Sequence, residues 1–144
     1  MPQRRDPYLN FNFRVEIEGD AIAGFSEVDL PEGRIEAVAY REGTDPGSAA
    51  RLLPGRVKWE PVVLRRGFTG EPALFEWWSD VLHGNVARRN VVIVLLDEQR
   101  NDVARWVIRE AWPQKWDGPD LRGLGNDVAI ETIELAHEGV ELVH

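Results

Sequence analysis

The sequence predicts a mainly β, single-domain fold: a β-barrel made of two packed antiparallel sheets, with one flanking α-helix. Three observations support this prediction. The chain has 144 residues, about the size of one domain. Short segments with alternating apolar and polar residues recur along its length, and each such segment is typical of a half-buried strand. Only one segment has apolar residues at helical spacing, so the helix is expected on the side of the barrel.

Composition and charge narrow the possible functions. Apolar residues make up 43% and charged residues 29% of the chain, which is typical of soluble globular domains. The start of the chain lacks the apolar stretch of a signal peptide, and cysteine is absent, so we expect a protein that folds in the cytoplasm. The net charge of −8 argues against a protein that grips nucleic acid through phosphate contacts.

The first three expected strands lie in the first 41 residues. Residues 10–18 alternate without a break and present Phe11, Phe13, Val15 and Ile17 on one face. A tight turn at 19–20 leads to a second strand over 21–28. Residues 34–41 form the third strand, and apolar residues on both of its faces suggest that it is covered on both sides.

Residues 43–55 break this pattern. The segment holds three glycines and two prolines and has little periodicity, so it predicts a long loop or a flexible hairpin. It also carries Leu52 and Leu53, which a fully solvated loop would not favour. Folded back on itself, the segment could reach about 20 Å, far enough to touch a neighbouring subunit.

The helix is expected between two further groups of strands. Residues 57–66 predict a strand with an edge or a bulge at Pro61. Thr69 is the expected N-cap and Gly84 the stop signal of the helix. The apolar residues at helical spacing between them are Leu74, Trp77, Trp78, Val81 and Leu82.

The last third of the sequence predicts an antiparallel set of strands. Residues 90–96 are apolar on both faces and are expected to be central. Residues 103–110 form their hairpin partner, and 111–116 extend the chain through Pro113. A loop over 117–125 then leads to a final long strand over 127–137.

No catalytic or metal site is predicted. The three histidines have no metal-ligand spacing, and none of the serines lies in a nucleophile elbow. Gly123 and Gly125 begin a dinucleotide motif, but a strand rather than a helix follows them. The carboxylates of Glu16, Glu18, Glu131 and Glu134 alternate along expected strands and are expected to point outward. We therefore expect no enzyme activity and no cofactor.

The tryptophans are expected to fill the core or to line an interface. Trp106 is predicted to be a core residue. Trp77 and Trp78 are adjacent on one helix and differ in direction by about 100°. One of the pair should face the barrel while the other lies toward the rim, where an exposed aromatic residue suits a subunit interface.

Several segments, in order from residue 6 to residue 139, resemble the tail-tube proteins of contractile phages and related injection systems, including the Hcp-like proteins. The segments that carry the resemblance are D-P-Y-L-N-F-N-F-R-V-E-I-E-G, G-F-S-E-V, Y-R-E-G, L-P-G, R-R-N-V-V-I-V-L-L-D-E, A-R-W-V-I-R-E-A-W-P-Q-K-W-D-G-P-D-L and G-N-D-V-A-I-E-T-I-E-L-A-H-E-G.

The resemblance implies a structural subunit that forms hexameric rings. The rings would stack into a hollow tube that conducts cargo or DNA when a surrounding sheath contracts. The implied partners are other copies of the chain, a contractile sheath protein, baseplate or tube-initiator proteins and tube-cap proteins, with no membrane anchoring. Trp78 was suggested above by the helix pattern, and the resemblance adds the other interface candidates: Asp6, Pro7, Tyr8, Thr44, Asp45, Pro46, Gly47, Ser48, Ala49, Ala50, Arg51, Leu52, Leu53, His137 and Glu138.

Two alternatives remain open from the sequence. The chain could be a tube-initiating or baseplate paralogue, in which stacking ends after one ring. In a different class, it could be a small monomeric β-barrel that binds a ligand. The type of parent particle (phage, tailocin or extracellular injection system) does not follow from the sequence.

Overall fold

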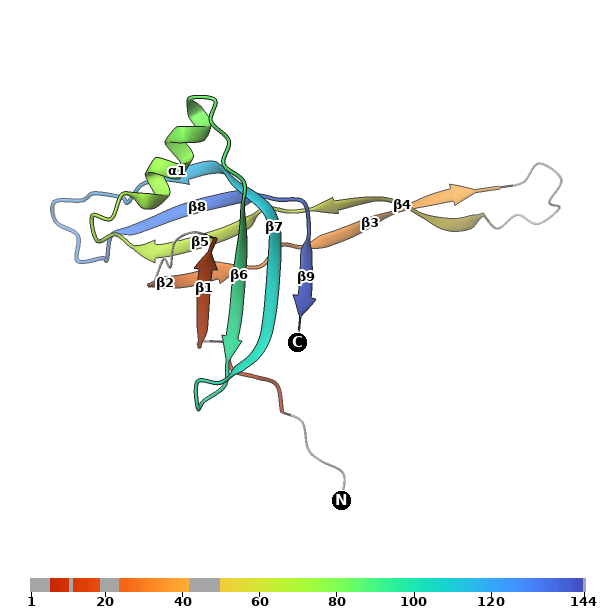
Figure 1. Ribbon diagram of the computed structural model, residues 1–144, viewed down its shortest axis with the longest axis horizontal. Helices are drawn as coiled ribbons and strands as arrows, with labels where there is room; N and C mark the ends of the chain where they lie inside the picture. Colours follow the sequence, from red (N-terminus) through yellow and green to blue (C-terminus); the bar gives the residue numbers. More distant parts are fainter. Residues whose placement is uncertain (1–5, 11, 19–23, 42–49, 144) are drawn as a thin grey trace, which may run out of the picture.

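A computed structural model describes residues 6–10, 12–18, 24–41 and 50–143 of the chain. The described residues form nine strands and one helix (Figure 1). In chain order they are β1 (Phe13–Ile17), β2 (Phe25–Asp29), β3 (Gly33–Tyr40), β4 (Arg51–Trp59), β5 (Val62–Gly67), α1 (Ala73–Leu82), β6 (Arg89–Leu96), β7 (Asp102–Asp117), β8 (Ile130–Ala136) and β9 (Val140–Val143).

Seven strands form the body of the molecule. They pair in the order β1-β6-β7-β8-β5-β2, and β9 pairs with β7 beside this path. All of these pairs are antiparallel. The first part of β7 pairs with β6 and β9, while its last part pairs with β8, so this strand belongs to two sheets that face each other across the core (Figure 1). The prediction of two packed antiparallel sheets with a flanking helix is confirmed, although β1 and β2 remain the two ends of the path.

Strand β7 bends where its pairing partner changes. Glu110 has a φ of 52°, which is uncommon for a residue other than glycine. The side-chain oxygen of Asn90 accepts a hydrogen bond from the Glu110 N–H at 3.1 Å and helps to hold this bend. The sequence predicted the two halves of β7 as separate segments, 103–110 and 111–116. The structure joins them into one bent strand.

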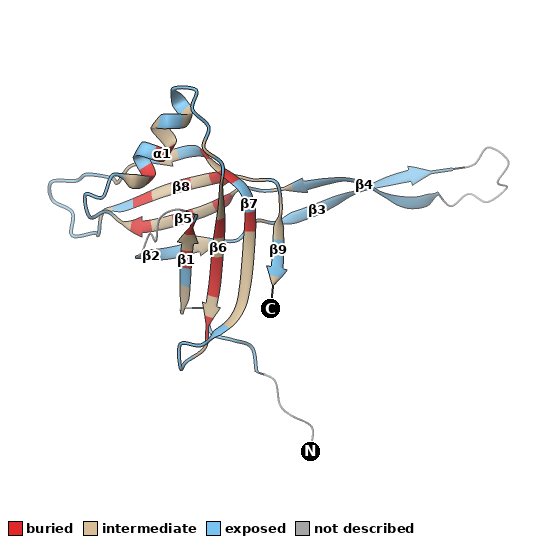
Figure 2. Cartoon of the chain, viewed as in Figure 1, coloured by how far each residue is buried: buried red, intermediate tan, exposed pale blue. Residues whose placement is uncertain are grey.

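The core lies between the two sheets and under the helix (Figure 2). It contains inward-facing residues of β1, β5, β6, β7 and β8, together with two residues of α1. Trp106, predicted as a core residue, is partly buried and packs against this cluster. The buried members are Val15, Ile17, Val62, Leu64, Leu74, Trp77, Val91, Ile93, Ile108, Ala111, Ile133 and Leu135.

The helix begins four residues later than Thr69, the predicted N-cap. Pro72 occupies the N-cap position, and the carboxylate of Glu71 accepts a hydrogen bond from the backbone N–H of Ala73 at 3.2 Å. The prediction of Thr69 as the N-cap was wrong because Gly70, with a φ of 89°, turns the chain before the helix starts. Gly84, also with positive φ, follows the last turn as predicted.

Strands β3 and β4 form a two-stranded hairpin, here called the arm, that projects away from the body (Figure 1). Of the segment 43–55, predicted as a long loop or a flexible hairpin, residues 51–55 lie in β4 of this hairpin, and residues 43–49 lie outside the described residues. The predicted single strand over 57–66 is two strands, because β4 ends at Trp59 and β5 begins at Val62, with Pro61 between them. Proline lacks the N–H that a continuous ladder needs.

The end of the chain also differs from the prediction. Strand β8 begins at Ile130, three residues later than expected. After Gly139, which has a φ of 143°, the chain forms β9, a strand that the sequence analysis missed. Four residues are too few to show a clear period, which explains why this strand was missed.

Candidate assembly surface

The two faces of the arm differ in chemistry. Strand β3 alternates regularly, and its register with β4 pairs Ile35 with Val57 and Ala39 with Leu52. These side chains share one face, which we call the apolar arm face; its members are Ile35, Ala37, Ala39, Leu52, Pro54 and Val57. The opposite face is mixed, since Arg34 lies across from Lys58, Val38 from Leu53 and Tyr40 from Arg51.

None of the described residues outside the arm covers it. All eight residues of β3 and the first eight of β4 are exposed (Figure 2). Leu52 keeps 67% of its surface accessible, while Ile35 and Val57 keep 59% each. An isolated two-stranded hairpin is marginally stable in water. A contiguous exposed apolar surface of this kind is typical of a site where another protein binds.

The arm is positively charged, unlike the rest of the chain. Strands β3 and β4 contain Arg34, Arg51, Arg56 and Lys58 but only one carboxylate, that of Glu36, giving a net charge of +3. The whole chain carries −8, so the remaining residues carry −11. This separation of charge favours contact between the arm of one molecule and the body of another.

His137 lies at the base of the arm and contacts residues of its own chain. Nδ1 of His137 accepts a hydrogen bond from the N–H of Gly139 at 3.1 Å, and Nε2 donates to the carbonyl of Glu60 at 2.9 Å. The imidazole also lies 5.9 Å from the Trp59 ring at the end of β4. The Trp59 ring passes so close to Gly33 that a Cβ there would come within 2.6 Å of it. His137 was predicted as an interface residue; the structure shows contacts with its own chain.

The other predicted interface residues lie in separate places. Tyr8, in the described segment before β1, is exposed together with Asp6 and Pro7. Trp78 is half-buried beside Phe75 and Trp116, with its ring 6.1 Å and 6.4 Å from theirs. The remaining predicted residues that the structure describes, which are all exposed, are Ala50, Arg51, Leu52, Leu53 and Glu138. Thr44, Asp45, Pro46, Gly47, Ser48 and Ala49 lie outside the described residues.

The tryptophan pair on α1 behaves as predicted. Trp77 is buried, and its Nε1 donates a hydrogen bond to the carbonyl of Ala87 at 2.8 Å. Trp78 points to the rim, where the Phe75 and Trp116 rings meet edge-on at 4.9 Å. Whether Trp78 also contacts a neighbouring subunit stays a prediction.

The prediction that Glu131 points outward was wrong. Glu131 is fully buried, and its carboxylate accepts hydrogen bonds from Nε of Arg66 at 2.8 Å and from Nε1 of Trp116 at 2.7 Å. Arg66 also donates to the carbonyl of Glu71 at 2.9 Å. Glu131 shares the inward face of β8 with Ile133 and Leu135. The hydrogen bonds from Arg66 and Trp116 satisfy its carboxylate, and the bond to the Glu71 carbonyl helps to satisfy the Arg66 guanidinium. The network joins β5, β7, β8 and the start of α1.

The other three carboxylates lie at or near the surface. Glu16 and Glu134 are partly exposed, and Glu18 is exposed. Nε of Arg14 donates to Glu16 at 2.8 Å, and the N–H of Asn90 donates to Glu18 at 2.9 Å. The carboxylates of Glu16 and Glu18 therefore take part in structural contacts.

Ion pairs hold the two outer strands of the body. On β5, Arg65 reaches Asp29 at 2.9 Å and Glu27 at 3.3 Å, both on β2. The hydrogen bond with Asp29 raises the pKa of the Arg65 guanidinium above its ordinary value. On β1, hydrogen bonds with Asp102 and then Glu16 likewise raise the pKa of Arg14. Both arginines therefore stay charged at any pH at which the protein folds.

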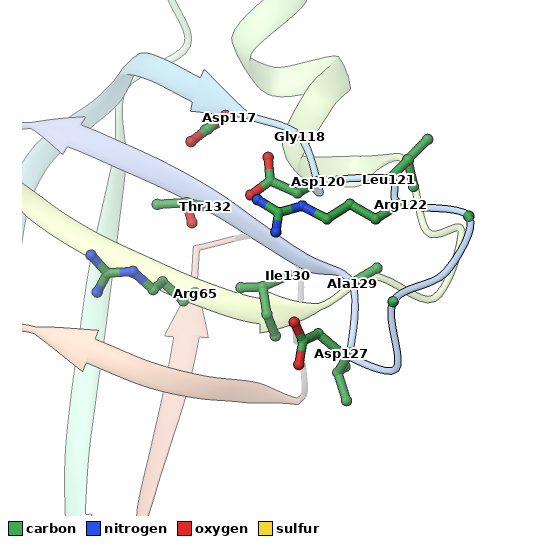
Figure 3. A pocket seen from close by; sticks show the side chains of 13 residues that line it. Arg65, Asp117, Gly118, Asp120, Leu121, Arg122, Asp127, Ala129, Ile130 and Thr132 are labelled. Carbon is green, nitrogen blue, oxygen red and sulfur yellow. The ribbon is translucent and has the colours of Figure 1, made fainter.

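A hollow of about 650 Å³ lies at the end of the body away from the arm (Figures 1 and 3). Residues 117–130, which connect β7 to β8 and include the first residue of β8, supply most of its lining. Asp120 and Arg122 project over it, and Arg65 borders it from β5 (Figure 3). Leu121 and Leu124 in the same segment are 86% and 101% exposed.

The described part of the chain contains neither a cluster of metal-ligating side chains nor a membrane-spanning helix. Among these residues, no three His, Asp or Glu side chains are grouped so that they could hold a metal ion. The helix in the same residues, α1, is not long and apolar enough to cross a membrane.

Comparisons with solved structures identify the fold. The chain is similar to a protein in the cryo-EM structure of the anti-feeding prophage (AFP) baseplate, with 26% identity, a TM-score of 0.83 and 97% of each chain covered. It is also similar to a chain of the PVC sheath-tube complex, an extracellular contractile injection system, with 24% identity, a TM-score of 0.84, and 95% of this chain and 91% of that one covered.

More distant proteins share the same fold. Hcp1 from Flavobacterium johnsoniae has 13% identity and a TM-score of 0.55, with 90% of this chain and 93% of that one covered. No protein among curated sequences matches the chain.

The sequence itself supplies the family. Residues 9–141 match the family described as T4-like virus tail tube protein gp19, which is nearly the whole chain. A tail tube protein is a structural component and not an enzyme, which agrees with the expectation from the sequence. The chain belongs to the T4-like tail tube protein family and is a tail tube protein of a phage or a contractile injection system.

Proposed function

We propose that this chain forms six-membered rings that stack into the hollow inner tube of a contractile particle, with the arm joining successive rings. The observation that carries the proposal is the arm, whose apolar face is exposed although the body has a complete core. A second copy of the chain would cover this face. The related AFP baseplate structure is described as 6-fold symmetrised, which supports the number of subunits in a ring.

The partners follow from the same proposal. The matched PVC structures are a sheath-tube complex and a sheath/tube terminator, and the matched AFP structures are a baseplate and a tube-terminating cap. We infer that this chain meets a contractile sheath protein, a baseplate or tube-initiator protein and a cap protein. Assembly would take place in the bacterial cytoplasm, before the finished virion or tail-like particle leaves the cell.

The charge of the chain suits a conducting tube. Strands β1 and β8 each carry polar side chains on the face away from the core, including Glu16 and Glu134. If these faces line the lumen, a chain with net charge −8 would repel DNA or acidic cargo and let it pass. Neighbouring subunits in a ring would also cover the outer strands β1 and β2, which are otherwise open to unwanted pairing.

The test is electron microscopy of the purified full-length chain and of a variant with a shortened arm. In the variant, an Asn-Gly turn replaces residues 35–57, which include the whole apolar arm face, and joins Arg34 to Lys58, which are already paired. The full chain should form stacked tubes, and the variant should give single rings with an unchanged thermal unfolding transition. Tubes of full length from the variant would overturn the role of the arm, and a homogeneous 16.4 kDa monomer from the full chain would overturn the proposal.

The same images test the alternative that the chain is a tube-initiating paralogue. One observation favours this alternative: one of the matched structures is a baseplate. A tube-initiating subunit would give single rings from the full-length chain, and adding a tube protein would extend them on one side. Stacks formed by the full-length chain alone identify the main tube subunit.

A further inference from the structure

We infer that the apolar arm face of one copy binds residues 117–130 of a copy in the next ring; these residues are called the acceptor segment. The inference rests on the proposed function and names the surface that the arm would meet. The first reason is exposure. The acceptor segment presents Leu121, Leu124 and Val128 to solvent, with 86%, 101% and 74% of their surfaces accessible. Loops seldom expose three large apolar side chains unless a partner covers them.

The second reason is the placement of the two surfaces. The arm extends from one end of the molecule, and the acceptor segment lies at the other end (Figure 1). A contact between opposite ends of identical chains is heterologous, so it continues as an open stack wherever the rotation between copies does not close into a ring. Contacts of this geometry add one ring after another along a tube axis, whereas a contact between identical surfaces would stop at a pair of rings.

The third reason is charge. The acceptor segment contains Asp117, Asp120 and Asp127 with one cation, Arg122, so its net charge is −2. The arm strands carry +3. Arg56 and Lys58 are exposed, and in the described part of the chain they form no ion pair that would neutralise them. Arg34 and Lys58 lie on the side opposite the apolar arm face, so the opposite charges attract the arm as a whole to the acceptor segment and disfavour an arm meeting another arm.

The fourth reason is shape. The acceptor segment lines a hollow of about 650 Å³, a size typical of sites that enclose a bound group. The arm presents Leu52 and Val57 on a narrow two-stranded support, so these side chains can reach into such a hollow. The open side of the hollow faces solvent between the acceptor segment and β5 (Figure 3).

Engineered disulfides test the contact directly, because the natural chain has no cysteine. The double variant Leu52→Cys with Leu124→Cys is assembled and then oxidised. A disulfide forms only where the two Cα atoms approach within about 7 Å. We expect a ladder of covalent multimers on a non-reducing gel, since each copy would be linked through its arm to one neighbour and through its acceptor segment to another.

The matched control joins the same arm position to an exposed residue of α1. The double variant Leu52→Cys with Leu82→Cys has a similarly accessible second thiol, because Leu82 is 64% exposed. It should give no ladder. If tubes form but the Leu124 pair cross-links no faster than this control, the inference is overturned while the proposed function stands. If the wild-type chain forms neither rings nor tubes, the proposed function itself has failed.

A charge exchange gives a second test that does not depend on thiol geometry. The variant Arg56→Glu with Lys58→Glu should form about tenfold fewer tubes, as should Asp120→Lys with Asp127→Lys. Combining all four substitutions should restore tubes. Pairing the arm variant with Glu98→Lys, in the turn between β6 and β7, should not restore them. Failure of the combined variant to exceed the mismatched one would contradict the inference.

Discussion

Strands β5 and β3 both carry apolar side chains at alternate positions, Val62 and Leu64 in β5 and Ile35, Ala37 and Ala39 in β3, but these side chains meet different surroundings. Alternate residues of β5, beginning with Val62 and Leu64, are buried in the core. All eight residues of β3 are exposed. The apolar residues of β5 are covered by the core, whereas those of β3 meet only their cross-strand neighbours on β4 and stay exposed among the described residues. Alternation thus indicates that a face will be covered, but it does not tell which molecule supplies the cover.

The buried ion pair in the body provides the largest expected contrast. Glu131→Ala leaves the Arg66 guanidinium buried without its carboxylate partner, so it should lower the free energy of unfolding by about 3–5 kcal/mol. Chemical denaturation in dilute solution measures this loss. Glu134→Ala, on the same strand but facing away from the core, is the control and should change it by about 0.5 kcal/mol or less. An equal effect of the two substitutions would show that the network does not hold the body together.

Leucine truncations in the two regions should affect different measurements. Leu135→Ala removes a fully buried side chain from β8 and should cost about 2–5 kcal/mol of unfolding free energy. Leu52→Ala, on the apolar arm face, should cost about 0.5 kcal/mol or less, because the side chain is exposed.

Tube formation, in contrast to the free energy of unfolding, should be sensitive to Leu52→Ala. Electron microscopy of Leu52→Ala should reveal fewer tubes although the subunit is folded. If Leu52→Ala destabilises the isolated subunit as much as Leu135→Ala does, the arm is part of the core and the comparison fails.

Substitution of His137, which connects the arm to the body, should have a smaller effect on the free energy of unfolding. His137→Ala removes hydrogen bonds to Glu60 and Gly139 at the base of the arm, which should cost about 1 kcal/mol. Amide hydrogen exchange should become faster in β3 and β4 and remain unchanged in β5 and β8. His83→Ala, at the end of the helix, is the control for loss of an imidazole. Uniformly faster exchange would indicate that His137 supports the whole fold and not the arm.

The smallest effect is expected at the outer strand β2. Arg65→Gln removes the ion pairs with Asp29 and Glu27, and exposed pairs of this kind contribute about 0–1 kcal/mol. The loss should shrink further as salt is added, because ions screen exposed charges. A loss that does not change with salt would mean that packing by the arginine stem, and not charge, holds β2.

The sequence predicted the body well because its strands bury one face each. Phe13, Val15 and Ile17 fall in β1, and the central position expected for 90–96 agrees with β6, which lies between β1 and β7. The helix was found, but its N-cap was not, because a glycine turn and Pro72 replace the usual side-chain cap. Glu131 was misplaced because a lone carboxylate in a strand is usually solvated, and its buried partners are far away in the sequence.

The assembly surface could be predicted only in outline. Glycines and prolines between 43 and 55 suggested a loop, yet Pro54 and Gly55 lie within β4. A bulge near these positions, where the β3–β4 register shifts, accommodates them. The apolar arm face emerges only from the register, since Leu52 and Ala39 become neighbours through pairing. No local sequence signal indicated that Leu121 and Leu124 would lie on a surface opposite the arm.

The continuity of β7 has a mechanical consequence. Its sixteen residues are hydrogen-bonded to β6 and β9 in one sheet and to β8 in the other. Neither sheet can peel away without pulling on the strand that anchors the other. A force applied to a subunit is therefore shared across the whole body. We expect the body to unfold in a single all-or-none transition and not one sheet at a time.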